Sequence, residues 1–324
     1  GQDLTSKSDE SLYPPHVKFI SPLLEYGYPP AVKEYRNGQL QEKPILLYLP
    51  GFDGSFLSPF LQFPELHTIF DVRCLIVGIE DRSTVGDLRE AILRYLRKVT
   101  TTTTNNLTPT FEIDDQHDIL ATNTSTTSTT ASIPARRSKR KRASSSISRP
   151  FYLAGESFGG ILACEVAMAL RDDPTLSLQG LTLINPATCY DRSRLAAEGP
   201  EVAESPPSLY WINLLRLLPL FTDEYSVEQL LMILRGEALP SVIDDAMREA
   251  YLGRVAFSLP FVVPTMKQGT LQWRLEKWLE AGSASMDMDK LSELASDKSL
   301  RVLLVVGEKD ATLPSIDEAE RLSG

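Results

Sequence analysis

Residues 155–159 separate two strongly apolar stretches of the chain. Their sequence, Gly-Glu-Ser-Phe-Gly, fits the pattern G-x-S-x-G. Residues 151–154 before them are typical of a short buried strand, and residues 159–170 after them are typical of a helix that is apolar all round except at Glu165. A sharp strand-to-helix turn needs small residues beside its central residue, and here both are glycine. The sequence therefore predicts that Ser157 lies on such a turn, at the amino end of a helix.

Four further apolar runs predict the other strands of a sheet. They lack the alternation of a half-exposed strand, which is typical of strands buried on both faces. Helical patterns separate the runs, and one of them, at 85–99, begins with Thr84 and Asp87 in a capping-box arrangement. Strands alternating with helices indicate mostly parallel pairing and the fold class α/β. The runs are 45–49, 72–79, 181–184 and 301–306.

Two regions depart from this α/β pattern. Residues 100–149 are rich in Thr and Ser, and they hold too little apolar surface to offset the entropy of ordering, so we expect a disordered insertion. Six of its residues between 136 and 142 are Lys or Arg; they indicate either a tolerated surface loop or a localisation or anion-binding patch. Residues 188–298 are mostly helical in pattern and predict a cap. The other predicted parts are an N-terminal segment at 1–43 and core parts at 44–99, 150–187 and 299–324.

One helix of the predicted cap has an apolar stripe. The stripe leaves Trp273 on the opposite side of the helix. It indicates either packing onto the core or a lid whose apolar face meets a lipid chain or a membrane surface. Its members are Leu271, Leu275, Trp278 and Leu279.

Charge and cysteine content exclude several classes of protein. The 324 residues have a net charge of −10, and −16 without the six clustered cations, which argues against a nucleic-acid-binding body. Cys74, Cys164 and Cys189 form no CxxC pair, so the sequence predicts neither a disulfide framework nor a zinc site. We expect no metal and no cofactor. No apolar run approaches the roughly 18 residues that span a bilayer.

Ser157 is the nucleophile that the G-x-S-x-G pattern predicts. Its hydroxyl would lie where the helix dipole favours a developing negative charge. Acyl transfer also needs N–H donors for the oxyanion, one from the residue after the nucleophile and one from a loop after an earlier strand. We expect these donors to be the backbone N–H groups of Phe158 and Phe52. Phe52 lies in a loop after the run 45–49 that also holds Gly51, Asp53 and Gly54.

Asp310 is the predicted acid of a Ser-His-Asp arrangement. It follows the run 301–306, in a loop at the carboxyl end of a strand, where the sites of α/β proteins are built. Asp191, in the loop after 181–184, is the alternative, since an acid there could also reach the base.

The sequence supplies no credible base for this arrangement. His16, His67 and His117 all precede Ser157, whereas the chain order in this type of site is Ser, acid, His. Residues 315–318 resemble a capping box that opens a helix shortly before residue 324. We therefore expect the catalytic histidine on roughly 20 to 30 further residues that hold the last helix and strand.

Together these motifs resemble the phytyl ester synthase family of plant and algal plastids, which are esterase-lipase-thioesterase-like acyltransferases. The resemblance spans about residues 44–324, apart from the insertion. It implies an α/β-hydrolase fold with a helical cap, joined in the family to a later acyltransferase-like part. The motifs are Leu-Pro-Gly-Phe-Asp-Gly at 49–54, Asp-Arg-Ser at 81–83, Gly-Glu-Ser-Phe-Gly-Gly at 155–160, Asn-Pro-Ala-Thr at 185–188, Gly-Glu-Lys-Asp at 307–310 and Leu-Pro-Ser at 313–315.

This resemblance implies transfer of a fatty acyl group from a lipid acyl donor to phytol, diacylglycerol or a related alcohol acceptor. It also implies a plastid location, at plastoglobules or thylakoids, and contact with a membrane or lipid-droplet surface. The chain departs from the family in two respects. The histidine is absent, and there is no H-x-x-x-x-D acyltransferase motif, because His67 is followed by Asp71 one position too early.

Other functions remain open from the sequence. A noncatalytic lipid- or partner-binding protein of the same fold would need no histidine. The basic insertion could recruit the protein to anionic head groups or to nucleic acid. Hydrolysis and transfer to an alcohol are not distinguished, because the outcome depends on how well the cap excludes water.

Overall fold

A six-stranded sheet forms the centre of the computed structural model, which describes residues 12–25, 32–36, 39–56, 58–101, 148–171, 173, 175–217, 220, 253, 266–296 and 300–323. The strands are β1 (Val17–Ile20), β4 (Ile45–Leu49), β5 (Asp71–Val77), β6 (Phe151–Glu156), β7 (Leu178–Ile184) and β8 (Arg301–Val305). Their order is β1-β5-β4-β6-β7-β8; β1 is antiparallel to β5 and the other pairs are parallel. The predicted α/β class with a mostly parallel sheet is confirmed. A separate pair joins β2 (Lys33–Arg36) to β3 (Gln39–Glu42).

Helices cover both faces of the sheet. The first four are α1 (Pro22–Glu25), α2 (Phe63–Ile69), α3 (Val85–Thr101) and α4 (Phe158–Leu170). Successive side chains of β4 point to opposite faces. Leu47 and Leu49 pack in one cluster with residues of α3 and α4, whereas Leu46 and Tyr48 pack in another with residues of α1 and α2. Because both faces are covered, every residue of β4 is buried, and the run shows no alternation in the sequence.

The two helices predicted most clearly from the sequence are α3 and α4. The capping box of α3 is confirmed: Thr84 N donates to the Asp87 carboxylate at 2.9 Å, and Asp87 N donates to the Thr84 hydroxyl at 3.3 Å. α4 is buried along most of its length, and its one charged residue, Glu165, accepts a hydrogen bond from Arg89 of α3 at 3.2 Å. α4 therefore packs against both the sheet and α3.

The N-terminal segment predicted at 1–43 contributes a strand to the main sheet. β1 pairs with β5, with Val17 opposite Val77 and Ile20 opposite Cys74. Within β1 the burial is uneven, because Val17 is buried and Lys18 is exposed. A four-residue edge strand of this kind lacks the continuous apolar character by which the other strands are predicted.

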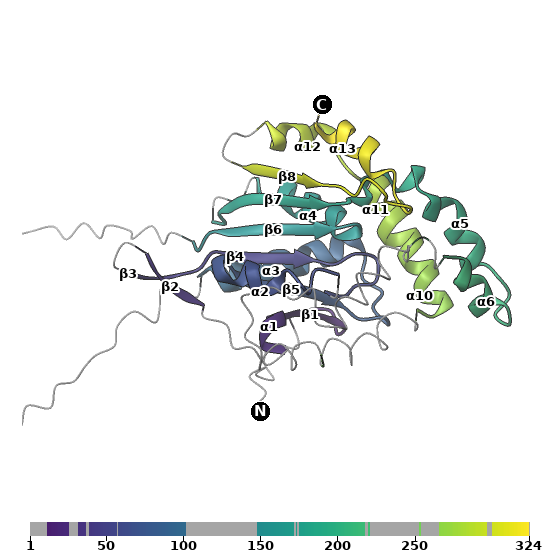
Figure 1. Ribbon diagram of the computed structural model, residues 1–324, viewed down its shortest axis with the longest axis horizontal. Coiled ribbons are helices and arrows are strands. Elements are labelled where there is room, and N and C mark those ends of the chain that lie inside the picture. Colours follow the sequence, from purple (N-terminus) through teal and green to yellow (C-terminus); the bar gives the residue numbers. More distant parts are fainter. Residues whose placement is uncertain are drawn as a thin grey trace, which may run out of the picture.

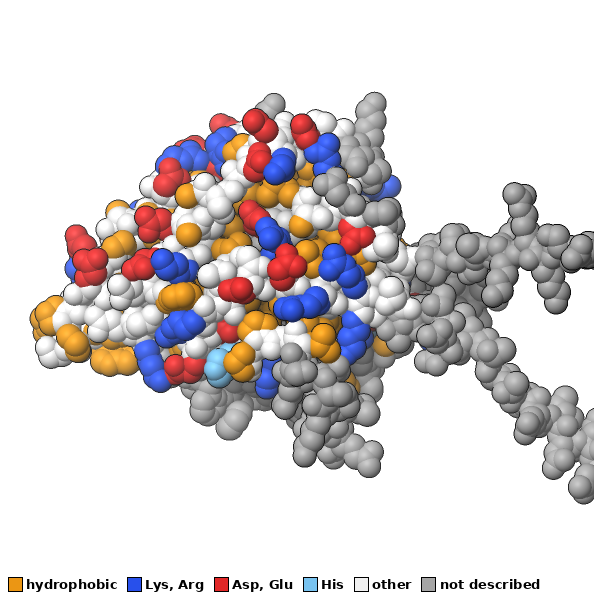
Figure 2. Space-filling model, turned by 180° about the vertical axis from the view of Figure 1, so that it is seen from behind, with side chains coloured by type: hydrophobic (Ala, Val, Ile, Leu, Met, Phe, Trp, Pro, Cys, Tyr) orange, Lys and Arg blue, Asp and Glu red, His pale blue; other side chains and the backbone are white. Residues whose placement is uncertain are grey.

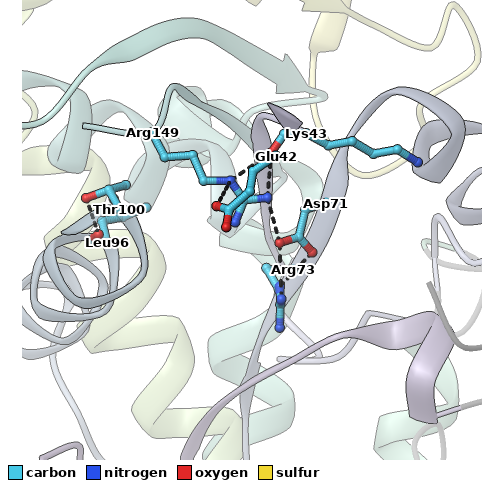
Figure 3. Close-up of polar contacts among 7 residues, drawn as sticks. All are labelled: Glu42, Lys43, Asp71, Arg73, Leu96, Thr100 and Arg149. Atoms are coloured by element: carbon cyan, nitrogen blue, oxygen red, sulfur yellow. Dashed lines mark hydrogen bonds and ion pairs between the residues drawn. The ribbon is translucent and has the colours of Figure 1, made fainter. Parts of the chain in front are cut away.

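The predicted insertion has ordered ends, and residues 102–147 between them lie outside the described residues. Arg149 N donates to Thr100 O at 3.4 Å, so the two ends meet. The nearly buried Arg149 guanidinium donates to Lys43 O at 2.7 Å and to the Asp71 carboxylate at 2.9 Å, as Figure 3 shows. The boundaries 100 and 149 thus belong to the core, at the amino ends of β4 and β5.

The described elements of the predicted cap are η2 (Ala187–Arg192), α5 (Arg194–Ala203), α6 (Tyr210–Leu214), η3 (Leu215–Leu217), α10 (Gln268–Trp273), the π-helix η4 (Arg274–Glu280), α11 (Ala281–Ala284) and α12 (Met288–Ala295). Of these, α5, α6 and α10 lie at the carboxyl end of the strands (Figure 1), whereas α12 packs against α4. The apolar stripe of α10 and η4 is buried against the core, and Trp273 is partly buried. The stripe therefore packs onto the core and does not form an open lid face. In the described parts of the chain, no helix has the length and apolar character needed to cross a bilayer.

β8 is an edge strand with apolar side chains in solvent. It pairs with β7, and no other described strand pairs with its outer side. Val302 and Leu303 are 41% and 56% exposed. Because neighbouring residues of a strand point to opposite faces, apolar surface is uncovered on both faces of this edge. The final helix, α13 (Ser315–Ser323), follows the loop after β8.

Candidate active site

Ser157 occupies a strained turn between β6 and α4. Its φ is 52° and its ψ −115°, a backbone conformation that a residue with a side chain rarely adopts. A Cβ on Gly155 would lie 2.1 Å from Gly159 O, and a Cβ on Gly159 would lie 2.1 Å from Leu49 O. Both glycines are therefore required by close backbone contacts, as the sequence predicts.

Three backbone hydrogen bonds fix the N–H and C=O groups of Ser157. Its N–H donates to Ile184 O at 2.9 Å, at the end of β7. Its carbonyl accepts from Gly160 N at 2.9 Å and from Ala187 N at 3.0 Å. The residue is partly exposed, whereas its neighbours in α4 are buried. The turn thus presents the serine hydroxyl at the cap end of the sheet.

The predicted oxyanion loop lies beside this turn. A Cβ on Gly51 would lie 3.6 Å from Ser157 Cβ, so the backbone of this loop is close to the serine. The loop closes as a turn in which Gly54 N donates to Gly51 O at 3.0 Å, and Gly54, with a φ of 73°, accepts from Val77 N at 2.9 Å. Phe52 is buried in this turn, and the exposed Asp53 accepts a hydrogen bond from Ser55.

Phe158 is the first residue of α4, and its side chain is fully buried. N–H groups in the first turn of a helix have no partner within the helix and point toward the space before it. Phe158 directly follows Ser157, and Phe52 directly follows Gly51, which lies against Ser157, so the structure brings the residues of both predicted oxyanion donors close to the serine.

Asp310 is held in the loop after β8 with both carboxylate oxygens engaged. Oδ1 accepts from Thr312 N at 2.9 Å and from Leu313 N at 3.1 Å, and Oδ2 accepts from the Ser315 hydroxyl. Asp310 and Ser157 follow strands at the same edge of the sheet, two strand spacings apart, which corresponds to about 10 Å between backbones.

Asn185, which sequence reasoning did not single out by role, connects the serine turn to the acid loop. It has a positive φ of 40° and lies at the end of β7, where its N–H donates to Val305 O at 2.9 Å. Its side-chain oxygen accepts from Gly307 N at 2.7 Å. Asn tolerates a left-handed conformation better than most residues, which is a weak sequence signal. The alternative acid, Asp191, lies within η2 with an exposed side chain and does not share this strand-end position.

The two described histidines lie away from Ser157. His16 pairs through its carbonyl with Gly78 N, beside β1, and β1 is three strand spacings, about 14 Å, from β6. His67 is buried in α2, and its carbonyl accepts from Lys43 Nζ at 2.7 Å, next to the amino end of β4. Burial and the nearby Lys43 charge lower the pKa of His67. His117 lies outside the described residues.

Glu156, directly before the serine, anchors the segment that follows the oxyanion loop. Its carboxylate accepts from the Tyr48 hydroxyl and from the Ser58 hydroxyl, the latter at 2.7 Å. Burial raises the pKa of Glu156 and that of Tyr48.

We find no group of three or more His, Cys, Asp and Glu side chains arranged for a metal ion among the described residues.

Comparison with known proteins supports the resemblance seen in the sequence. The chain is 26% identical over 286 residues to phytyl ester synthase 1, chloroplastic, of Arabidopsis thaliana, an alignment that covers 88% of this chain and 33% of that protein. It is 25% identical over 300 residues to phytyl ester synthase 2, chloroplastic, of the same plant, covering 89% of this chain and 34% of that protein. The chain therefore spans about a third of the length of these curated relatives. No family model matches it.

Solved structures similar to this chain include a variant of a meta-cleavage product hydrolase, with a TM-score of 0.44 and 16% identity over 90% of this chain and 84% of that one. Another is MenH of S. aureus, with a TM-score of 0.43 and 13% identity over 95% of each chain. The fold itself is recognised from the sheet. The strand order, the antiparallel edge strand, the serine turn after β6 and the acid after β8 are those of an α/β-hydrolase.

Proposed function

We propose that this chain, an α/β-hydrolase similar in sequence to the phytyl ester synthases, is the serine-dependent part of an acyltransferase or acyl-ester hydrolase that acts on lipids. One observation carries the proposal: Ser157 has the strained backbone of a nucleophile turn and lies against the glycine-rich loop at 51–54. Strain of this kind persists where the surrounding structure imposes it, and it is concentrated at catalytic sites.

In this mechanism the Ser157 hydroxyl attacks the carbonyl carbon of a fatty acyl ester or thioester. The proton passes to a histidine, and the tetrahedral oxyanion is stabilised by the backbone N–H groups of Phe52 and Phe158. Collapse of this intermediate expels the donor's alcohol or thiol, which takes the proton from the histidine, and leaves the acyl group on Ser157. An acceptor alcohol or water then releases the acyl group in the same way.

Asp310 orients that histidine, and neither of the two histidines in the described part of the chain, His16 and His67, lies near enough to serve. The base would come from polypeptide that follows residue 324. The uncovered edge of β8 supports such a segment, because an exposed edge strand with apolar side chains on both faces is suited to pair with a further strand. In isolation, residues 1–324 are then expected to be nearly inactive.

The similarity to chloroplastic phytyl ester synthases supports phytol, diacylglycerol or a related alcohol as acceptor and a plastid as location. A lipid acyl donor and an alcohol acceptor are the proposed partners.

Contact with a membrane or lipid-droplet surface is part of the same proposal. Apolar side chains gather at the cap end of the molecule, which is at the left of Figure 2. On α6 and η3, Trp211, Ile212 and Leu215 are each more than half exposed. A compact apolar patch on a helix is typical of proteins that insert shallowly into a lipid surface.

Labelling with a fluorophosphonate tests the nucleophile, with the protein expressed at its full natural length. We expect covalent labelling at Ser157, loss of labelling in Ser157→Ala, and a decrease of at least 100-fold in labelling rate in Asp310→Asn, because the histidine loses its orienting carboxylate. Residues 1–324 alone should label much more slowly.

Equal labelling of the wild type and Ser157→Ala would overturn the assignment of the nucleophile. If the wild type is folded, binds fatty acids and does not label at all, the noncatalytic lipid-binding protein becomes the better description.

A further inference from the structure

Arg274 is a fully buried cation at the junction of the cap and the sheet. It begins η4, and its guanidinium donates to the carbonyls of Phe52 at 2.7 Å, Val77 at 3.2 Å and Gly78 at 3.1 Å. Burial lowers its pKa to about 10, so the group stays charged at neutral pH. Burying a charge is costly compared with packing an apolar side chain of similar size. Filling space between the cap and the sheet therefore does not explain this residue.

The oxyanion loop is folded directly onto this guanidinium. A Cβ on Gly54 would lie 3.1 Å from Arg274 Nη2 and 2.4 Å from Val77 O. The loop therefore has no room for a side chain at this position. The carbonyl of Phe52 faces the cation in the same turn, so the peptide that follows the predicted donor Phe52 is fixed by Arg274.

The other side of the guanidinium leads to the second predicted donor. Its carbon atom lies 4.2 Å from the ring centroid of Trp278, one turn later in η4. Trp278 in turn stacks on Phe158, with ring centroids 4.4 Å apart and an angle of 9° between the planes. Trp278 is itself fixed, because its Nε1 donates to Ser83 O at 2.9 Å. A continuous stack thus runs from the oxyanion loop to the first residue of α4.

η4 is a π-helix, a form that is rare and often found at functional sites. Both Arg274 and Trp278 of this helix are fully buried.

We propose that Arg274 is a positioning residue that sets the spacing between the two oxyanion-hole donors, the N–H groups of Phe52 and Phe158. This inference rests on the proposed function. Oxyanion stabilisation requires donors 2.7–3.1 Å from the oxyanion. A shift of one donor therefore reduces the stabilisation of the transition state more than it reduces the binding of the substrate. Arg274 acts through the loop and the stack, and it does not touch the reacting atoms.

The test uses the full-length protein with Arg274→Lys, which retains the charge but cannot bond three carbonyls and stack as a plane. We expect the maximal rate of inactivation by a fluorophosphonate, and kcat with a short-chain p-nitrophenyl ester, to decrease about 10- to 100-fold. KM and the inhibitor's binding constant should change less than about threefold. A second variant, Trp278→Leu, removes the stack and leaves the Arg274 hydrogen bonds, and its kcat should decrease in the same way.

Arg82→Gln is the matched control, because Arg82 also ties the cap to the sheet, through Thr270 Oγ1 at 3.0 Å, without contacting the oxyanion loop. Its kcat should stay within about threefold of the wild type at a temperature where all variants are folded. An unchanged kcat in both Arg274→Lys and Trp278→Leu, or an equal decrease in Arg82→Gln, would overturn the inference. If Arg274→Lys does not fold, Trp278→Leu alone decides. Failure of the proposed function is distinguishable, because the wild type would then not label at Ser157.

Discussion

At the serine turn, single carbon atoms decide whether the backbone can form. We expect Gly155→Ala to destabilise the protein by about 3 kcal/mol or more, because its Cβ would lie 2.1 Å from Gly159 O and 2.8 Å from Ala163 Cβ. Both obstacles are rigid parts of α4 that cannot move aside without displacing the helix. Urea unfolding followed by circular dichroism measures the change.

Gly269→Ala is the control for Gly155→Ala. Gly269 lies in α10 and is exposed, and no atom is within 4 Å of a Cβ built on it. We expect this substitution to stabilise the protein by about 0.5–1 kcal/mol, since alanine loses less backbone entropy than glycine in a helix. Similar losses from both substitutions would mean that the close contacts at the turn are not the cause.

Residues of the site differ in how visible they are in the sequence. Ser157 and its glycines are predicted because a local steric rule connects them within five positions. Asn185 and Arg274 act on partners 122 and 222 positions away, and nothing local marks such contacts. The positions of the two predicted oxyanion donors relative to each other therefore could not be predicted from the sequence.

Elements are predicted best where burial on both faces removes ambiguity. β4 has the same bounds in the sequence prediction and in the structure, whereas β6 and β7 extend two and three residues beyond their predictions. β1, β2 and β3 were not predicted, since short or half-exposed strands give no continuous apolar run. The region predicted at 100–149 was identified by composition, and composition cannot reveal that Arg149 is an anchor.

Replacing residues 102–147 by a linker of about four glycine and serine residues should leave the core and the site intact. Arg149 N bonds to Thr100 O, so the ends are already close and a short loop closes at small entropic cost. The ends of the insertion, Thr100 and Arg149, lie at the amino ends of β4 and β5. Ser157 lies at the carboxyl ends of the strands, on the far side of the sheet from the insertion. We expect Tm and the rate of Ser157 labelling to be unchanged within error. Loss of labelling with an unchanged Tm would show that the insertion takes part in the site.

Two arginine substitutions complete the experiment on the insertion. Arg149→Ala should cost about 2–3 kcal/mol, because it removes charged hydrogen bonds to the buried Asp71. Arg97→Ala, which breaks the more exposed pair with Asp173, should cost less than about 1 kcal/mol. A deletion of 135–149 would also remove the anchor, so a test of the basic cluster should end before Arg149.

The exposed apolar side chains of α6 and η3, which are Trp211, Ile212 and Leu215, predict that the whole molecule attaches to lipid surfaces through its cap. We expect the double substitution Ile212→Glu with Leu215→Glu to reduce binding to vesicles of phosphatidylcholine and phosphatidylglycerol at least tenfold in co-sedimentation. Burying one such side chain stabilises by about 1.5–3 kcal/mol, and the added charges resist insertion.

Leu24→Glu, at a position 56% exposed on α1 and away from the cap, should leave vesicle binding unchanged. An equal reduction in this control would attribute binding to total charge. Vesicle binding that does not respond to either substitution would place the lipid contact elsewhere on the molecule.

The contacts of Arg274 also limit how this protein could be recombined with its relatives. A helical cap is commonly regarded as an interchangeable module grafted on a conserved scaffold. Here the guanidinium that secures a loop of the scaffold is carried by the module. A chimaera that receives a foreign cap would lose this clamp even if its serine, its glycines and its aspartate were all retained. When a cap is exchanged to change specificity, Arg274 and Trp278 of the original chain should therefore be kept with the sheet and its loops, and only the rest of the cap replaced.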